Sequence, residues 1–325
     1  MSTYKALVTG ETRGSTMNNH CHTRPYSMQG PETCPEPAPT SSIKELFPAR
    51  ELAKKLKSPA ILSLEFLFKM LPKILAFIAS SLTVQATQTF QNVGTTAGWD
   101  AIFIDSGSKG TVQQVSNVVY QGPSALKMTQ VYDSSYTGRY HSEVHHYNAM
   151  KKGDTGFYGF AFRLQEDWQS SPAQSYNIAQ FIADFTDLGC SETYMPGTMV
   201  EILGDQLVTR RKYGSVCPTS SQQTEYYNNL ATITPGVWHK IEIQASWQSD
   251  SSGYLKLWLD GNKVLERLNV ATSVTDGRAF EFRVGLYANG WHDDKQNKGT
   301  QNTRQVWFDE VGLGTAFADA DPDQW

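Results

Sequence analysis

Ionisable side chains alternate along one short stretch of this chain. Arg139, His141, Glu143 and His145 stand at every second position. Side chains of a β-strand point alternately to its two faces, so these four would share one face. Four ionisable groups cannot face a dry core without a large free-energy cost, so we expect them to line a cleft. An ordinary solvated outer face is the alternative.

A zinc site is a second chemical interpretation of this stretch. His141 and His145 flank Glu143, and imidazole and carboxylate groups are common zinc ligands. However, the sequence shows no third cluster of ligands and no cysteine spacing typical of a metal site. The pattern therefore favours a cleft over a zinc site.

Two further segments place polar side chains among apolar ones. Gln180 interrupts the apolar run of residues 176–185, and a buried mid-strand amide needs hydrogen-bond partners or a ligand. In the segment 282–291 a small glycine would leave room for a ligand beside a tyrosine, although core packing would also explain that tyrosine. The residues of this segment that would share one face are Arg283, Gly285, Tyr287 and Asn289.

The elements that must position these residues are short strands. From Thr87 onward, alternating runs are separated by Gly, Asp, Asn and Ser turns, and no stretch has a convincing helical period. Residues 254–264 are predicted to form a hairpin with Asp260 and Gly261 at its tip. This succession of strands and regular turns predicts an all-β sandwich or jelly roll.

One stretch has a more specific pattern. Residues 237–264 combine a first tryptophan, Trp238, with a strand that ends at Trp247 and a hairpin that contains Trp258-Leu-Asp-Gly. This pattern resembles that of the concanavalin-A-like jelly rolls, which bind or cut glycans. The resemblance implies two packed antiparallel sheets with a concave substrate cleft.

The three polar segments also resemble motifs of the jelly-roll alginate lyases. Those enzymes carry Arg-Ser/Thr-Glu-Leu/Val-Arg, Gln-Ile/Val-His and Tyr-Phe-Lys-Ala-Gly-x-Tyr-x-Gln on three strands. In the same order this chain has His141-Ser-Glu-Val-His, Gln180-Phe-Ile and Glu281-Phe-Arg-Val-Gly-Leu-Tyr-Ala-Asn. Both motif arginines are histidines here, the motif histidine is Ile182, and the final glutamine is Asn289.

With these departures, the region from Thr87 to Trp325 is more similar to the glucuronan lyases of polysaccharide lyase family 20. The resemblance implies an enzyme that cuts β-1,4-linked glucuronic acid by β-elimination and leaves an unsaturated uronic acid end. It also implies a cleft in which a histidine, a glutamine and a tyrosine meet the uronate. The substrate partner would be an acidic polysaccharide, and no cofactor would be required for the chemistry.

Elimination from a uronate defines the roles that these residues would take. An enzyme must stabilise the enolate at the carboxylate, remove the C5 proton and protonate the O4 leaving group. Gln180 can donate hydrogen bonds to the enolate. In a gluco-configured uronate H5 and O4 lie on the same side, so Tyr287 could serve as base and acid if nearby cations lower its pKa. His141 is the alternative base. The substrate-binding residues would be Arg139, Glu143, His145, Arg283 and Asn289.

A structural calcium ion is a further expectation. Jelly rolls of this type often carry one away from the cleft, and Asp309 on the last predicted strand could supply an oxygen ligand. An ordinary surface carboxylate is the alternative. We expect the protein to act as a monomer.

Two other functions would fit the same fold. A lectin-like binding module would keep the fold and the aromatic side chains but would not need an aligned Tyr, His and Gln. A glycoside hydrolase needs two carboxylates beside the scissile bond. The usual Glu-x-Asp-x-x-Glu signature is absent, and Asp309 and Glu310 would point to opposite faces.

The first 86 residues differ from the rest. Residues 1–60 are rich in Pro, Ser, Thr and Lys, and we interpret residues 1–69 as disordered or as a gene-model artefact. Residues 70–86 have a methionine, Lys73, a short apolar run and a small-x-small ending, as a secretory signal peptide does. The apolar run is too short to span a bilayer. A core helix or an anchor with a short cytoplasmic tail would be alternatives.

Charge and cysteine content agree with export of residues 87–325. Residues 1–86 carry a net charge of +4 and residues 87–325 a net charge of −8. An acidic surface argues against nucleic acid as a partner, and the mature form is not expected to bind membranes. Its two cysteines, Cys190 and Cys217, are predicted to form one disulfide in an oxidising, extracellular compartment.

Overall fold

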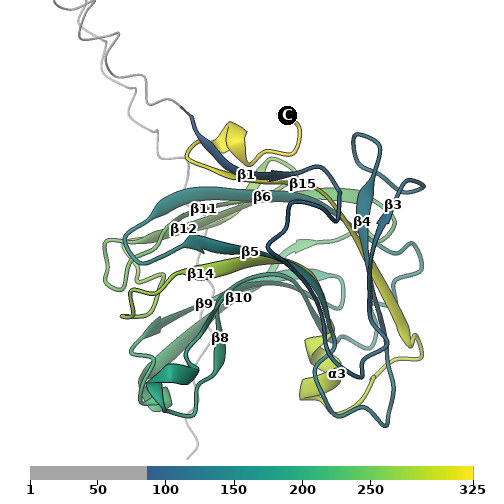
Figure 1. The fold of residues 1–325 in the computed structure, drawn as a ribbon, viewed down its shortest axis with the longest axis horizontal. Coiled ribbons are helices and arrows are strands. Elements are labelled where there is room, and N and C mark those ends of the chain that lie inside the picture. Colours follow the sequence, from purple (N-terminus) through teal and green to yellow (C-terminus); the bar gives the residue numbers. More distant parts are fainter. Residues whose placement is uncertain (1–85, 325) are drawn as a thin grey trace, which may run out of the picture. The chain divides into compact units, whose positions relative to one another are not determined.

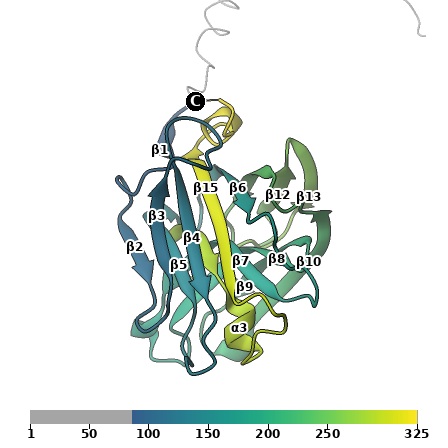
Figure 2. The ribbon, with the colours of Figure 1, turned by 90° about the vertical axis from the view of Figure 1, so that its right-hand side faces the viewer.

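The described part of the chain is a sandwich of two antiparallel sheets. The computed structural model describes residues 86–324, and the predicted signal peptide and the segment before it lie almost entirely outside this range. Fifteen strands, one short α-helix and three 3-10 turns make up the described residues (Figures 1 and 2). The predicted all-β jelly roll is confirmed.

The two sheets are named here sheet A and sheet B. In spatial order, sheet A contains β13 (Asn262–Leu268), β12 (Tyr254–Leu259), β11 (Trp238–Ser246), β6 (Thr155–Leu164), β15 (Thr303–Gly314), β4 (Ala125–Val131) and β3 (Thr111–Val115), and β1 (Gln88–Asn92) pairs with β15. Sheet B contains β10 (Gln222–Thr232), β9 (Gln206–Gly214), β8 (Tyr194–Leu203), β7 (Ser175–Asp184), β14 (Phe280–Tyr287), β5 (His141–Met150) and β2 (Ala101–Ile104). The helical elements are α3 (Asn289–Asp293), η1 (Thr186–Leu188), η2 (Thr219–Ser221) and η3 (Phe317–Asp319).

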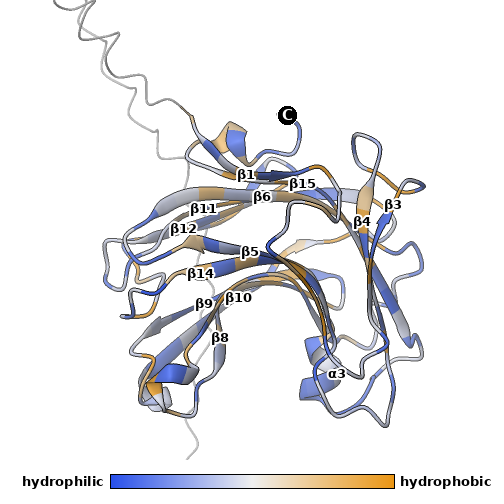
Figure 3. Ribbon diagram, in the orientation of Figure 1, coloured by the Kyte–Doolittle hydropathy of each residue, from blue (hydrophilic) through white to orange (hydrophobic). Residues whose placement is uncertain are grey.

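Aromatic side chains from both sheets form the centre of the core. The ring of Phe282 on β14 lies 6.3 Å from that of Phe160 on β6 and 4.9 Å from that of Phe181 on β7, centroid to centroid. All three are nearly inaccessible to solvent. Figure 3 shows the hydrophobic residues along the strands and the hydrophilic residues at α3 and the turns. Packing of these rings between the sheets fixes which face of each strand is left for function.

The predicted hairpin is present as β12 and β13. Asp260 and Gly261 connect the strands, and both have positive φ angles, 51° and 76°. Two central residues with positive φ are the hallmark of the type I′ turn that Asp-Gly favours. The predicted pairing of Cys190 with Cys217 is also confirmed, since the two cysteines are bonded with their Cα atoms 6.0 Å apart.

Sheet B is strongly curved. Figure 1 shows β5, β14 and β8 bending over like an arch, with α3 at one foot of the arch. Register shifts interrupt the pairing of β7 with β8 and of β14 with β7, and such irregularities bend a sheet. The face of sheet B away from sheet A is therefore concave, and a groove on it runs across the strands. Within residues 86–324, none of the helices has the length and apolarity needed to cross a membrane.

Candidate active site

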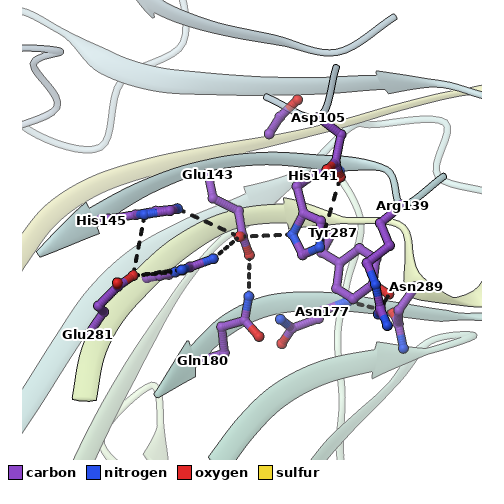
Figure 4. Close-up of polar contacts among 12 residues, drawn as sticks. Asp105, Arg139, His141, Glu143, His145, Asn177, Gln180, Glu281, Tyr287 and Asn289 are labelled. Carbon is purple, nitrogen blue, oxygen red and sulfur yellow. Dashed lines mark hydrogen bonds and ion pairs between the residues drawn. The ribbon is translucent and has the colours of Figure 1, made fainter. Parts of the chain in front are cut away.

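A hollow of about 420 Å³ opens on the concave face of sheet B. Its walls come from β2, β5, β7, β14 and the start of β8. His141, Gln180 and Tyr287, predicted from three separate segments, all line it. Figure 4 shows how these side chains converge. The register explains the convergence, because Tyr287 on β14 lies opposite His141 on β5 and Arg283 lies opposite Gln180 on β7.

The imidazole of His141 is held on three sides. Its Nδ1 lies 2.9 Å from Oε2 of Glu143, and its Nε2 lies 4.0 Å from Oδ2 of Asp105. Its ring stacks on Tyr287 with centroids 3.8 Å apart and an angle of 15° between the planes. A carboxylate at Nδ1 favours a proton on that nitrogen and leaves Nε2 as the group that can accept a proton.

Tyr287 differs from the expectation. Nη1 of Arg139 donates a hydrogen bond of 2.7 Å to the Tyr287 hydroxyl, so a cation is present as predicted. Burial nevertheless raises the pKa of Tyr287, and the Arg139 charge only partly offsets it. The Tyr287 side chain is buried, so the neutral form of its hydroxyl dominates at neutral pH. The expected lowering of the Tyr287 pKa is therefore wrong. A neutral Tyr287 hydroxyl carries a proton and can act as a hydrogen-bond donor.

Glu143 lies beneath the hollow rather than in its lining. Its carboxylate is almost fully buried, where it also accepts a 2.7 Å hydrogen bond from Nε2 of Gln180. Burial would raise the pKa of Glu143, but His141 and Arg283 outweigh it and lower that pKa to about 2. Glu143 is therefore an ionised anchor that orients His141 and Gln180, not the substrate-binding residue that we expected.

The space above Gly285 is occupied by Glu143. A Cβ atom on Gly285 would lie 2.9 Å from Cγ of Glu143 and closer still to its backbone. The expectation that this glycine leaves room for a ligand is therefore corrected. The room that it leaves is filled by the Glu143 side chain, because that side chain must cross β14 to reach β7.

Arg283 and His145 lie at the other end of the hollow. Nε of Arg283 donates a 2.7 Å hydrogen bond to Glu281, and Nη1 of Arg283 lies 3.6 Å from Glu143. Nδ1 of His145 lies 3.4 Å from Glu281. Burial, followed by the charge of Arg283, lowers the pKa of His145 to about 4. His145 is therefore neutral at pH 7, and the charge of Arg283 is shared between two carboxylates.

Comparison with known proteins places this geometry in a family. The family model described as polysaccharide lyase matches residues 91–312. A crystal structure of endo-β-1,4-glucuronan lyase from the fungus Trichoderma reesei is 53% identical, with a TM-score of 0.71, and the match covers 74% of this chain and 100% of that one. The chain belongs to the polysaccharide lyase family. It is an enzyme of the lyase class.

Other comparisons are more distant. The marine family 14 alginate lyase from Aplysia kurodai is 10% identical with a TM-score of 0.43, and the match covers 71% of this chain and 100% of that one. A family 7 alginate lyase is 14% identical with a TM-score of 0.40, over 59% of this chain and 78% of that one. A search of the curated proteins found no match.

Two predicted residues of the lyase lie away from the hollow. Asn289 follows the end of β14 at the first turn of α3, where its amide donates to Glu201 and accepts a hydrogen bond from the backbone N–H of Asn177. It therefore does not share the face of Tyr287, because the strand ends before it. Asp309 on β15 accepts hydrogen bonds from the backbone N–H groups of Tyr120 and Gln121.

Asp309 therefore ties the 120–121 loop to sheet A, which explains why this carboxylate is buried. Calcium binding at Asp309 stays a prediction. Among residues 86–324, no group of three or more His, Cys, Asp or Glu side chains could hold a metal ion. The alternating histidines instead use Nδ1 atoms to contact Glu143 and Glu281, which leaves the zinc interpretation without support in this part of the chain.

Sequence reasoning missed several residues of the hollow. Asp105 follows the short edge strand β2 and accepts a hydrogen bond from the backbone N–H of His141, and burial raises its pKa. Glu281 stands two positions before Arg283, a spacing that could have indicated an ion pair on one strand face. Phe103 and Tyr194 line the hollow on either side of Arg283, whose guanidinium lies 6.0 and 5.7 Å from their ring centroids.

Proposed function

We propose that this lyase cleaves β-1,4-linked glucuronan by β-elimination and leaves an unsaturated uronic acid at the new non-reducing end. The observation that carries the proposal is the convergence of His141, Tyr287 and Gln180 from three strands in one hollow. The 53% identical fungal enzyme, an endo-β-1,4-glucuronan lyase, supports the same substrate. The lectin-like and hydrolase alternatives are not favoured.

Stabilisation of the enolate is assigned to Gln180 and Arg139. One Nε2–H of Gln180 is held by Glu143, which orients the amide so that its second N–H can donate to the substrate carboxylate. Arg139 contacts the neutral hydroxyl of Tyr287 and forms no ion pair within residues 86–324, whereas Arg283 is paired with carboxylates. Charge and hydrogen bonds at the carboxylate stabilise the negative charge that develops when C5 loses its proton.

Proton transfer is assigned to the stacked pair of His141 and Tyr287. Nε2 of His141 takes the C5 proton, and the electron pair of the C5–H bond forms the C4–C5 double bond. The C4–O4 bond breaks, and the Tyr287 hydroxyl gives its proton to O4. H5 and O4 lie on the same side of a glucuronate ring, so two side chains whose rings stack on one wall, with centroids 3.8 Å apart, can serve both atoms.

Export and assembly are also proposed. We infer that the lyase is secreted as a monomer after cleavage near Ala86, that its mature form binds no membrane, and that it needs no cofactor for the chemistry. The disulfide between Cys190 and Cys217 supports an oxidising compartment. N-terminal sequencing of protein from the culture medium should start near Thr87, and a mature protein that starts at Met1 would contradict the proposal.

A panel of polyuronates tests the substrate. The lyase is incubated with glucuronan, polymannuronate, polyguluronate and polygalacturonate, and the ultraviolet absorbance of the unsaturated product is followed. We expect the fastest release with glucuronan. A faster release from a polymer in which H5 and O4 lie on opposite sides would overturn the assignment of both protons to one wall.

A further inference from the structure

A line of side chains crosses the whole of sheet B on its concave face. Each residue of the line lies directly opposite the next in the strand register, and residues opposite each other point to the same face. We call this line the cross-strand row. From β5 to β10 it consists of His145, Arg283, Gln180, Met199, Arg210 and Tyr226.

The cross-strand row extends beyond the hollow. The lining of the hollow ends at the start of β8, whereas Arg210 lies on β9 and Tyr226 on β10. In sheet B the strands β7, β8, β9 and β10 are paired in that order. Because the lining of the hollow runs across the strands from β2 to the start of β8, a polymer chain held in the hollow would continue along this row.

Arg210 and Tyr226 have the chemistry to bind an acidic sugar. Tyr226 is 54% exposed, an unusual fraction for a large ring, and an exposed ring can stack on a pyranose face. The Arg210 guanidinium lies 5.8 Å from the centre of that ring, and its Nη1 donates a long 3.4 Å hydrogen bond to the Tyr226 hydroxyl.

Arg210 also retains donors for a ligand. Its Nη2 donates no hydrogen bond within residues 86–324, and no carboxylate of these residues forms an ion pair with Arg210. The neighbouring Arg211 differs, since it points to the other face and pairs with Glu225. An arginine without an acidic partner is a favourable site for the carboxylate of a uronate.

We propose that Arg210 and Tyr226 form a distal subsite that binds a uronate residue of the polymer remote from the scissile bond. The proposal rests on the proposed function of the hollow. Three strand spacings separate Gln180 from Tyr226, or about 14 Å, which about three β-1,4-linked pyranose rings would span. The subsite would increase affinity for long chains without a part in proton transfer.

The test compares Arg210→Gln with wild type on polymeric glucuronan and on oligomers down to the shortest that is cleaved. A charge-assisted hydrogen bond is lost, so we expect KM for the polymer to rise about tenfold while kcat is unchanged. KM for the shortest oligomer should not change, because that oligomer cannot reach β10. Raised salt should weaken polymer binding less in Arg210→Gln than in wild type.

Matched variants make the result decisive. Arg267 on β13 of sheet A also lies over a tyrosine ring, that of Tyr227. The variant Arg267→Gln should therefore behave as wild type. Arg210→Lys should recover part of the polymer affinity. If Arg210→Gln does not fold, Tyr226→Ala, which truncates an exposed ring, is expected to raise KM for the polymer alone.

Two results would overturn the subsite. The first is an unchanged KM for the polymer in both Arg210→Gln and Tyr226→Ala. The second is a KM that rises equally for the polymer and for the shortest oligomer. Failure of the proposed function would give a different result, because the wild-type protein would then release no unsaturated product from glucuronan.

Discussion

Among single residues, the stacked rings of His141 and Tyr287 are the proposed base and acid of the elimination. Glu143 holds Nδ1 of His141 and leaves Nε2 toward the hollow, while burial keeps the proton on Tyr287. A base and an acid with different surroundings can act in one step, whereas a single tyrosine would first have to lose its proton. The environment of each ring, rather than its residue type, assigns its role.

Replacement of Tyr287 by phenylalanine tests the acid. The change removes only the hydroxyl, so the stack on His141 should remain and the protein should fold as wild type. General acid–base groups contribute about 10²–10⁴-fold, so kcat on glucuronan should fall by at least that order. Circular dichroism and the thermal midpoint serve as controls. Near-normal release of unsaturated product would show that Tyr287 does not carry a proton.

His145 predicts a dependence of stability on pH. Its pKa is about 4 in the folded protein, below the ordinary value of 6.5. Between these values the unfolded chain binds a proton that the folded chain does not, so the free energy of unfolding falls as the pH drops from 6.5 towards 4.

Denaturant unfolding at pH 7 and pH 5 measures this effect. Between pH 7 and pH 5, His145 should lower the free energy of unfolding by about 2 kcal/mol. His145→Gln cannot titrate and should lose correspondingly less stability over the same interval. An identical loss in wild type and variant would show that other groups cause the acid sensitivity.

Among the strands, the path of the Glu143 side chain from β5 across β14 depends on Gly285. A Cβ atom there would meet the backbone and side chain of Glu143 at 2.6 to 2.9 Å. Gly285→Ala should therefore displace Glu143, with a loss of stability of about 1–3 kcal/mol and a lower kcat. Gly277→Ala is the matched control, since no atom lies within 4 Å of a Cβ at that glycine. If Gly285→Ala retains full kcat, the placement of Glu143 across β14 is not needed for catalysis.

Part of this architecture could be predicted from the sequence. Alternation along 141–145 and the motif order predicted that His141, Gln180 and Tyr287 share a site, because both signals are local to single strands. Asn289 was misplaced because the alternation ends where β14 stops and α3 starts. The burial of Glu143 and the alignment of Gln180 with Arg210 depend on pairing between strands distant in sequence, which no local pattern contains.

At the scale of the molecule, the C-terminal segment covers a buried carboxyl group on the outer face of sheet A. Glu242 on β11 lies opposite Gly159, and a Cβ atom on Gly159 would lie 1.9 Å from the carbonyl oxygen of Ala320. Neither carboxyl oxygen of Glu242 has a hydrogen-bond partner among the described residues. Burial raises the pKa of Glu242 to about 7, and Lys240 offsets this only in part.

Glu242 therefore opposes His145 in its effect on stability. From pH 4.5 to 7 the folded chain keeps a proton that the unfolded chain has lost, so the contribution of Glu242 falls as the pH rises. Glu242→Gln should be more stable than wild type by about 3 kcal/mol at pH 8, and the gain should shrink at pH 5. Thermal unfolding of both proteins at pH 8 and pH 5 measures this difference in stability. A difference that does not depend on pH would refute the role of Glu242 ionisation.

For the whole molecule, we propose that the hollow on sheet B breaks uronate chains by elimination through His141 and Tyr287. The most direct measurement counts new reducing ends and new unsaturated ends in the same glucuronan digest. Elimination predicts one unsaturated end for every reducing end, with both lost together in Tyr287→Phe. New reducing ends without unsaturated ends would mean hydrolysis, and would contradict the chemistry assigned to this site.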